Sequence, residues 1–138
     1  MRIMAIDYGK KKVGLAITDP LCIISQPLLT IEVKSQKELI QRLKFIIEEN
    51  NVGLILIGNP ISHSGNSTKM SQEVSKFATK LRKMINIDIK LWDERFTSRY
   101  AEKSLKDIGL KKKDVKIDQI AASIILDEYL KSQSIGFV

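Results

Sequence analysis

The chain has 138 residues, of which 43% are hydrophobic and 28% are charged. This length suits one domain, and the composition is typical of a globular protein with a buried core, so it excludes a disordered chain and a fibrous repeat. A net charge of +7 and a pI near 9.5 favour polyanionic partners such as RNA or DNA, although a solvated lysine-rich surface fits the same numbers.

The start of the chain and its one cysteine predict a cytoplasmic protein with no membrane contact. The first residues lack a basic region with a small-residue cleavage site, and no apolar run has membrane length. Cys22 cannot form an internal disulfide. Its neighbours Leu21 and Ile23 favour a packed thiol over a reactive one.

The first third of the chain predicts three strands. Apolar runs over 3–6 and 13–18 flank a basic turn, Lys10-Lys11-Lys12, and so predict a hairpin. A third extended segment over 23–33 contains Pro27, which favours an edge strand or a bulge.

The rest of the chain alternates helical and extended patterns. Apolar spacing predicts a helix over 35–50, with Ser35 and Glu38 as a capping box. The apolar run 52–57 predicts a strand buried on both faces, as parallel sheets require. The remaining expected elements are a loop over 61–67, a helix over 70–81, a strand over 87–92, a helix over 100–108 and a helix over 116–130. The order predicts one α/β domain over residues 1–138, with a mixed five-stranded sheet flanked by helices.

Four ordered motifs carry a resemblance to a known family. They are the Ala5–Gly9 segment with Val13–Asp19, the turn Gly58-Asn59-Pro60, the segment Asp93–Thr97, and the segment Ile117–Ala122. Together they resemble the YqgF (RuvX-like) family of ribonuclease H-like proteins, described as Holliday junction resolvases or pre-16S ribosomal RNA nucleases, and the resemblance covers the whole chain. Asn59 departs from the usual leucine and affects only the local loop.

The resemblance implies a ribonuclease H-like fold and a hydrolase with an acidic site made of Asp7, Glu94 and Asp118. It implies maturation of the 5′ end of pre-16S ribosomal RNA, with pre-rRNA or ribosomal particles as partners. The alternatives are cleavage of structured DNA at four-way junctions, and an inactive nucleic-acid-binding module. A monomer or a weak homodimer is expected.

The chemistry of phosphodiester hydrolysis points to the same residue types. Two Mg²⁺ or Mn²⁺ ions activate the attacking water and stabilise the leaving oxygen, and these hard cations prefer carboxylate ligands. The chain has one histidine and one cysteine, which excludes a Cys/His zinc cluster.

Each carboxylate also has a plain structural interpretation. Asp7 closes an apolar strand, where it could be a turn aspartate. Glu94 follows the last strand, and its neighbour Asp93 is expected on the opposite face, as a solvated or helix-capping residue. Asp118 lies on an apolar helix face, where the alternative is interaction with the helix dipole.

The predicted substrate-binding residues surround these acids. They are Gly9, Lys10, Lys11, Lys12, Gly14 and Arg95. The two glycines are explained equally well by turn and strand packing, and Arg95 by a surface ion pair. Lys111, Lys112 and Lys113 are a second basic run, and His63 in the 61–67 loop is a weaker candidate.

One rival interpretation comes from the Asp7-x-Gly9 hairpin. It also resembles the first phosphate loop of actin-like ATPases and sugar kinases. Those proteins need two such domains, and 138 residues provide one.

Overall fold

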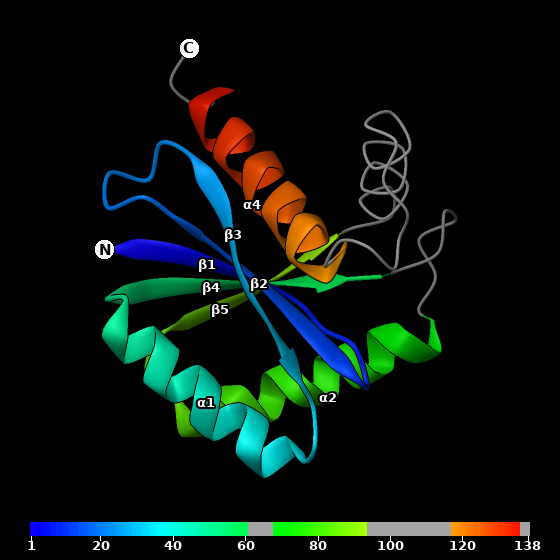
Figure 1. Cartoon of the computed structure of the whole chain (residues 1–138). Helices are drawn as coiled ribbons and strands as arrows, with labels where there is room; N and C mark the ends of the chain where they lie inside the picture. Colours follow the sequence, from blue (N-terminus) through cyan, green and yellow to red (C-terminus); the bar gives the residue numbers. More distant parts are fainter. Residues whose placement is uncertain (61–67, 94–116, 136–138) are drawn as a thin grey trace.

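The computed structural model describes residues 1–60, 68–93 and 117–135, which form a five-stranded sheet with helices on both faces (Figure 1). The elements are β1 (Arg2–Asp7), β2 (Lys12–Thr18), β3 (Ser25–Glu32), α1 (Gln36–Glu49), β4 (Val52–Asn59), α2 (Lys69–Met84), β5 (Asp88–Asp93) and α4 (Ile117–Ile135). The strand order is β3-β2-β1-β4-β5. The β1–β2 and β2–β3 pairs are antiparallel, whereas β1–β4 and β4–β5 are parallel. The predicted mixed sheet is confirmed.

The strand predictions hold in detail at the first hairpin and at the sheet edge. β1 and β2 pair around the basic turn, and β3 lies at the edge of the sheet. The register of β3 shifts where Leu29 and Pro27 pair with consecutive residues of β2. Proline lacks a backbone N–H, so an edge strand with an irregularity tolerates it best. β4 lies between two parallel neighbours, which explains its continuous apolar sequence.

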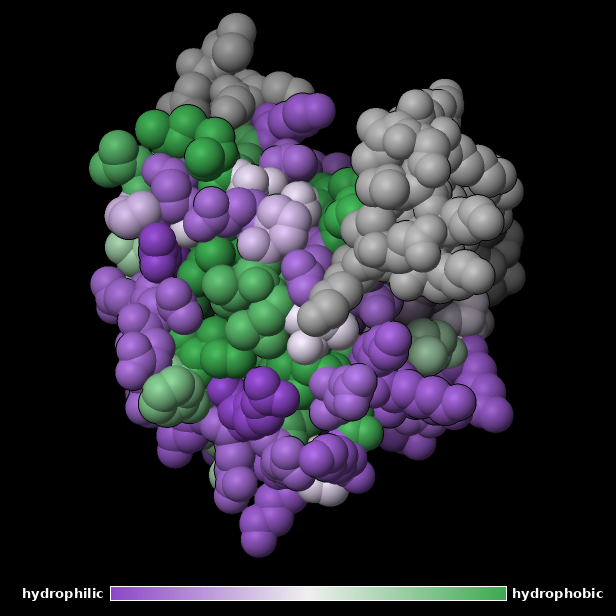
Figure 2. Space-filling model, in the orientation of Figure 1, coloured by the Kyte–Doolittle hydropathy of each residue, from purple (hydrophilic) through white to green (hydrophobic). Residues whose placement is uncertain are grey.

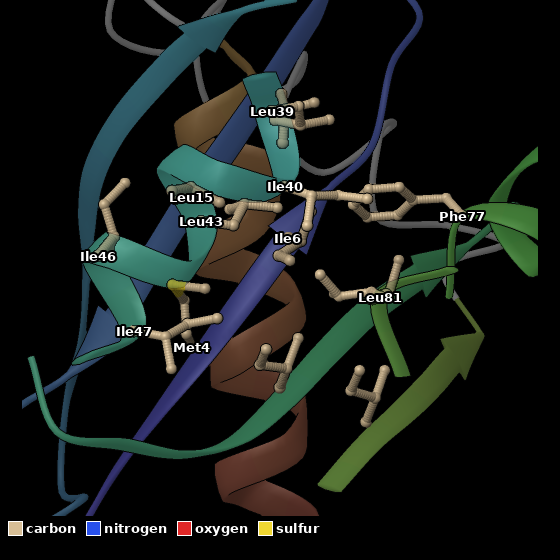
Figure 3. Close-up of a cluster of buried hydrophobic side chains, with 14 of the residues drawn as sticks. Met4, Ile6, Leu15, Leu39, Ile40, Leu43, Ile46, Ile47, Phe77 and Leu81 are labelled. Atoms are coloured by element: carbon tan, nitrogen blue, oxygen red, sulfur yellow. The ribbon is translucent and has the colours of Figure 1, made fainter. Parts of the chain in front are cut away.

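One face of the sheet packs against α1 and α2. Side chains alternate along a strand, so Met4 and Ile6 of β1 point to this face, where Leu43 of α1 and Phe77 and Leu81 of α2 meet them (Figure 3). All five side chains are fully buried. This cluster is the larger core of the molecule.

Hydrogen bonds at their N-termini fix where these two helices begin. The Ser35 side chain accepts from the Glu38 backbone N–H at 3.1 Å, which is one half of the predicted capping box. α2 has a full capping box: Thr68 Oγ1 accepts from the Ser71 N–H at 3.0 Å, and Ser71 Oγ accepts from the Thr68 N–H at 2.8 Å. The sequence pattern does not reveal this box, because its third position holds serine in place of Glu or Gln.

The other face of the sheet is covered by α4 (Figure 1). Ala5 of β1 and Ala16 of β2 lie beneath Ala122, Ile125 and Leu126 of the helix, and all of them are buried. Small residues at these positions let the helix approach the sheet closely. The helix extends to Ile135, five residues beyond the expected end, because no Gly or Pro interrupts the sequence before Gly136.

The loop between β2 and β3 contains Cys22, for which the sequence predicted a packed thiol on the evidence of its apolar neighbours. The apolar neighbours that favoured a packed thiol, Leu21 and Ile23, are 77% and 67% exposed. Hydrophobic atoms gather at the upper left of Figure 2, where Figure 1 places this loop. Cys22 is partly buried and has φ of 57°, and its Sγ donates to the Met1 carbonyl at 3.2 Å. Side chains of consecutive residues in such a turn point in different directions, so apolar neighbours do not imply a packed thiol.

Several expected elements lie outside the described residues. They are the loop over 61–67 with His63, the helix over 100–108, and the basic run Lys111–Lys113. Among the helices that the structure describes, none has the length and apolarity needed to span a membrane.

Candidate active site

Asp7 ends β1 on the face of the sheet that α4 covers. Ile3 and Ala5 of the same strand contact the α4 cluster, whereas Met4 and Ile6 face the opposite core. Because the side-chain direction repeats every two residues, Asp7 points to the α4 side. The residue is half-buried, so its carboxylate is partly removed from water.

Gly14 of β2 brings Asp118 to this place. Gly14 is the cross-strand partner of Asp7 in the β1–β2 ladder. A Cβ added to Gly14 would overlap the backbone carbonyl of Asp118 and would lie 2.6 Å from the Asp118 Cβ. Directly opposed residues in an antiparallel pair have Cα atoms about 4.5–5.5 Å apart and share a face. The first turn of α4 therefore places Asp118, which is half-buried, next to Asp7.

The structure bears on one predicted substrate-binding residue, Gly14. This residue is buried beneath α4, which favours the packing alternative over substrate contact. The helix occupies the space that a side chain would fill. At Gly9, an added Cβ would lie 2.6 Å from the Lys12 carbonyl oxygen, so the tight turn requires a glycine whether or not substrate approaches it.

Glu94, the third predicted ligand, directly follows β5 in the sequence. β5 lies two strands from β1, with β4 between them. Trp92 packs in the α4 cluster, so alternation directs the exposed Asp93 away from the face that carries Asp7. Asp93 is therefore not a third ligand beside Asp7. Glu94 and Arg95 lie outside the described residues, and their roles stay predictions.

Two contacts hold α4 against the sheet beyond its first turn. The Ser25 hydroxyl of β3 donates to Asp127, and it also contacts the Ser123 carbonyl at 3.2 Å. On the other side, the Trp92 indole N–H donates to Glu128 at 3.1 Å. The Trp92 ring also meets Tyr129 edge to face at a centroid distance of 5.5 Å. Asp127 and Glu128 therefore hold the helix in place, and they do not join the acidic site because they lie nine and ten residues beyond Asp118 along the helix.

Tyr8 is a residue of this region that the sequence analysis did not single out. Its ring stacks on Phe77 of α2 with centroids 4.4 Å apart, and its hydroxyl accepts from Gln36 Nε2 at 2.7 Å. Lys80 donates to Gln36 Oε1 at 2.9 Å, which links all three elements. Burial raises the pKa of Tyr8, and Glu73 adds to this, although the Gln36 hydrogen bond opposes it. The network ties the end of β1 to both helices, directly behind Asp7.

The basic turn Lys10-Lys11-Lys12 lies at the same end of the sheet. All three lysines are exposed, and they follow Asp7 by three to five residues. Exposed ammonium groups attract phosphodiester backbones through long-range electrostatics. This turn therefore presents three positive charges at the end of the sheet that carries Asp7.

The donor set at this site suits a hard divalent cation. Asp7 and Asp118 supply carboxylate oxygens, the ligand type that Mg²⁺ and Mn²⁺ prefer. In the described ranges, no three His, Cys, Asp or Glu side chains are close enough to hold a metal ion. Two of the three predicted ligands thus come together, and the third falls in the range that is not described.

Comparison with known proteins places this arrangement in a family. A model of the RuvX family, described as Holliday junction resolvase, matches residues 1–132. The chain belongs to the RuvX family. A *Dictyoglomus turgidum* relative named "Putative pre-16S rRNA nuclease" is 42% identical over 137 residues, covering 98% of this chain and 97% of the relative. A *Rickettsia typhi* relative of the same name is 43% identical over 132 residues, covering 94% and 85%.

Solved structures with the RuvX chain's fold include two resolvases. *Thermus thermophilus* RuvC in complex with a Holliday junction substrate aligns with a TM-score of 0.63 and 11% identity, over 97% of this chain and 96% of that one. The fowlpox virus resolvase in complex with Holliday junction DNA aligns with a TM-score of 0.57 and 17% identity, over 96% and 99%. At these identities the likeness establishes the ribonuclease H-like fold.

Proposed function

We propose that this RuvX-family chain is a divalent-metal-dependent nuclease that uses Asp7, Asp118 and Glu94 to hold the metal ions. The observation that carries the proposal is the meeting of Asp7 and Asp118 across Gly14 on one face of the sheet. Two half-buried carboxylates repel each other and lose hydration, which is costly unless a cation lies between them.

Held by these residues, Mg²⁺ or Mn²⁺ would activate the attacking water and stabilise the leaving oxygen of a phosphodiester. The chain's own contribution is positional. β1 fixes Asp7 at the end of the central strand, and the network around Tyr8 holds the strand end from behind. The lysines of the basic turn raise the local concentration of the polyanion.

The proposed substrate is precursor 16S ribosomal RNA, cleaved at or near its 5′ end in the cytoplasm. The support is the name carried by relatives that are 42–43% identical over nearly the whole chain. A four-way DNA junction is the second candidate, favoured by the description of the matching family. A resolvase cuts two strands symmetrically and needs a two-fold dimer, whereas an RNA nuclease can act as a monomer.

The deciding experiment offers both substrates to the same protein. Purified wild-type chain is incubated with a precursor 16S fragment, an unstructured RNA and a four-way DNA junction, each with Mg²⁺, Mn²⁺ or EDTA. We expect RNA cleavage that requires the metal and that Asp7→Asn removes. Asp88→Asn is the matched control, because Asp88 is an exposed carboxylate at the opposite end of a strand in the same sheet. Symmetric junction cleavage with RNA left intact would reverse the two candidates, and cleavage in EDTA would refute the metal role.

A further inference from the structure

The first turn of α4 rests on a strand residue that has no side chain. An added Cβ at Gly14 would meet the backbone of Asp118, which cannot move aside as a flexible side chain can. Gly53 of β4 is different, since the three atoms nearest to a Cβ there all belong to the flexible side chain of Met1. Gly14 thus sets how closely α4 can approach β2. The helix residue in contact with it is Asp118, a predicted metal ligand.

If the first turn of α4 moves away from the sheet, the rest of the helix cannot move with it, because other contacts hold its C-terminal half. Its C-terminal half is held at the edge strand by Ser25 and Asp127, and at β5 by Trp92 and Glu128. Between these contacts, Ala122, Ile125 and Leu126 are buried against the sheet. A methyl group at Gly14 therefore tilts the helix about its held half, so that the displacement is greatest at Asp118.

We propose that Gly14 is a positioning residue for the metal site, because its missing side chain sets the position of Asp118 relative to Asp7. This inference rests on the proposed function for the identity of the ligand, but the geometric relation stands independently of it. Gly14 touches neither substrate nor metal, and it acts only through Asp118. The role differs from the substrate contact that the sequence suggested for this glycine.

The size of the expected effect follows from the contact distance. Carbon atoms pack at about 3.5–4.0 Å, so a Cβ–Cβ separation of 2.6 Å requires a shift on the order of 1 Å. A shift of that size at a reacting group costs about 10²-fold in rate, and loss of residues that support a ligand typically weakens metal affinity about 10–100-fold. Gly14→Ala should therefore lower Mn²⁺ affinity at least about 10-fold in a folded protein.

The test compares wild type, Gly14→Ala and Gly53→Ala. Circular dichroism first verifies the fold, and calorimetric titration with Mn²⁺ then measures the affinity of each protein. Gly53→Ala is the matched control, being the same change in a strand of the same sheet, against a side chain that can move. We expect weaker Mn²⁺ binding for Gly14→Ala alone. Equal affinities for all three folded proteins would overturn the proposal.

A second readout needs no metal. The carboxyl ¹³C resonance of Asp118 is sensitive to a nearby charge, so Asp7→Asn should shift it in the wild-type background and shift it less beside Gly14→Ala, where the two side chains lie further apart. If wild type binds no Mn²⁺, the proposed function fails, and this resonance still decides the positioning role. An equal shift in both backgrounds would overturn that role.

A third variant covers the case in which Gly14→Ala does not fold. Adding Asp127→Ala and Glu128→Ala removes both contacts that hold the far half of α4, so the helix can move away from the sheet as a unit. This triple variant is expected to fold and to bind Mn²⁺ at least about 10-fold more weakly than the Asp127→Ala, Glu128→Ala double variant. Equal Mn²⁺ affinity in the two would contradict the proposal.

Discussion

Asp7 of β1 pairs with Gly14 of β2, and the first turn of α4 rests on Gly14 at this point, so Asp118 lies beside Asp7. Two negative charges meet here on a face that is partly closed to water. Like charges at close range oppose each other, and partial burial weakens the solvent screening between them. The acidic site is therefore expected to lower the stability of the metal-free protein.

Removing one of these charges should stabilise the metal-free fold. Asp118→Asn is expected to raise the free energy of unfolding in EDTA by about 1 kcal/mol, or a few degrees in melting temperature, while abolishing cleavage. Mg²⁺ at about 100 times its dissociation constant should stabilise wild type by about 2.7 kcal/mol, and the variant much less. Thermal melts across a Mg²⁺ titration measure both effects. Glu128→Gln is the control, since it removes a charge from the same helix and keeps an acceptor for Trp92. Identical melts for wild type and Asp118→Asn under all conditions would exclude Asp118 from the site.

The basic turn should affect substrate capture and leave the chemical step unchanged. Replacing Lys10, Lys11 and Lys12 by glutamine is expected to raise KM for RNA at constant kcat, because uniform electrostatic attraction is lost. The slope of log affinity against log salt should fall by about 2, at roughly 0.7 per phosphate contact on single-stranded RNA. The control replaces Lys44, Lys83 and Lys131, which are exposed on other parts of the molecule. A KM that changes equally in both triple variants would show a non-specific charge effect.

The network behind Asp7 should contribute measurably to stability. Tyr8→Phe keeps the stacking on Phe77 but removes the acceptor of the Gln36 hydrogen bond, at an expected cost of about 0.5–1.5 kcal/mol. Urea unfolding of Tyr8→Phe, Gln36→Ala and the double variant measures the coupling between the two residues. Additive effects in the double variant would show that the 2.7 Å contact contributes nothing.

The loop between β2 and β3 should lose stability in acid because of Asp19. Backbone N–H groups, chiefly that of Ile24 and then those of Ile23 and Leu21, hold the pKa of Asp19 below its usual value against the opposing effect of desolvation. A carboxyl group with a lowered folded-state pKa stabilises the fold above its unfolded pKa of about 3.9, and this stabilisation is lost as the pH falls through the folded value. Wild type should therefore exceed Asp19→Ala in stability at neutral pH, with the gap narrowing below about pH 4. Denaturant titrations at several pH values test this, and a gap that is independent of pH would contradict it.

Local sequence patterns determined the elements and the chemical type of the site. Alternation and apolar runs predicted all five strands, because a strand buried on one face or two must carry its side chains in that pattern. Asp7 was a candidate ligand because it closes the central apolar strand, where a turn aspartate is the structural alternative. Serine at the capping position predicted the start of α1 for an equally local reason.

Only the tertiary structure decided which residues meet. The pairing of Asp7 with Gly14 depends on strand register, and the approach of Asp118 depends on a helix about 100 residues further along the chain. For that reason Gly14 looked like a substrate contact in the sequence and proved to be the surface on which α4 rests. The exposure of Leu21 beside Cys22 likewise follows from the shape of a turn that Asp19 organises through its backbone bonds. Local propensity acts between neighbours in the chain, whereas a site is made by residues that the packing of the core brings together.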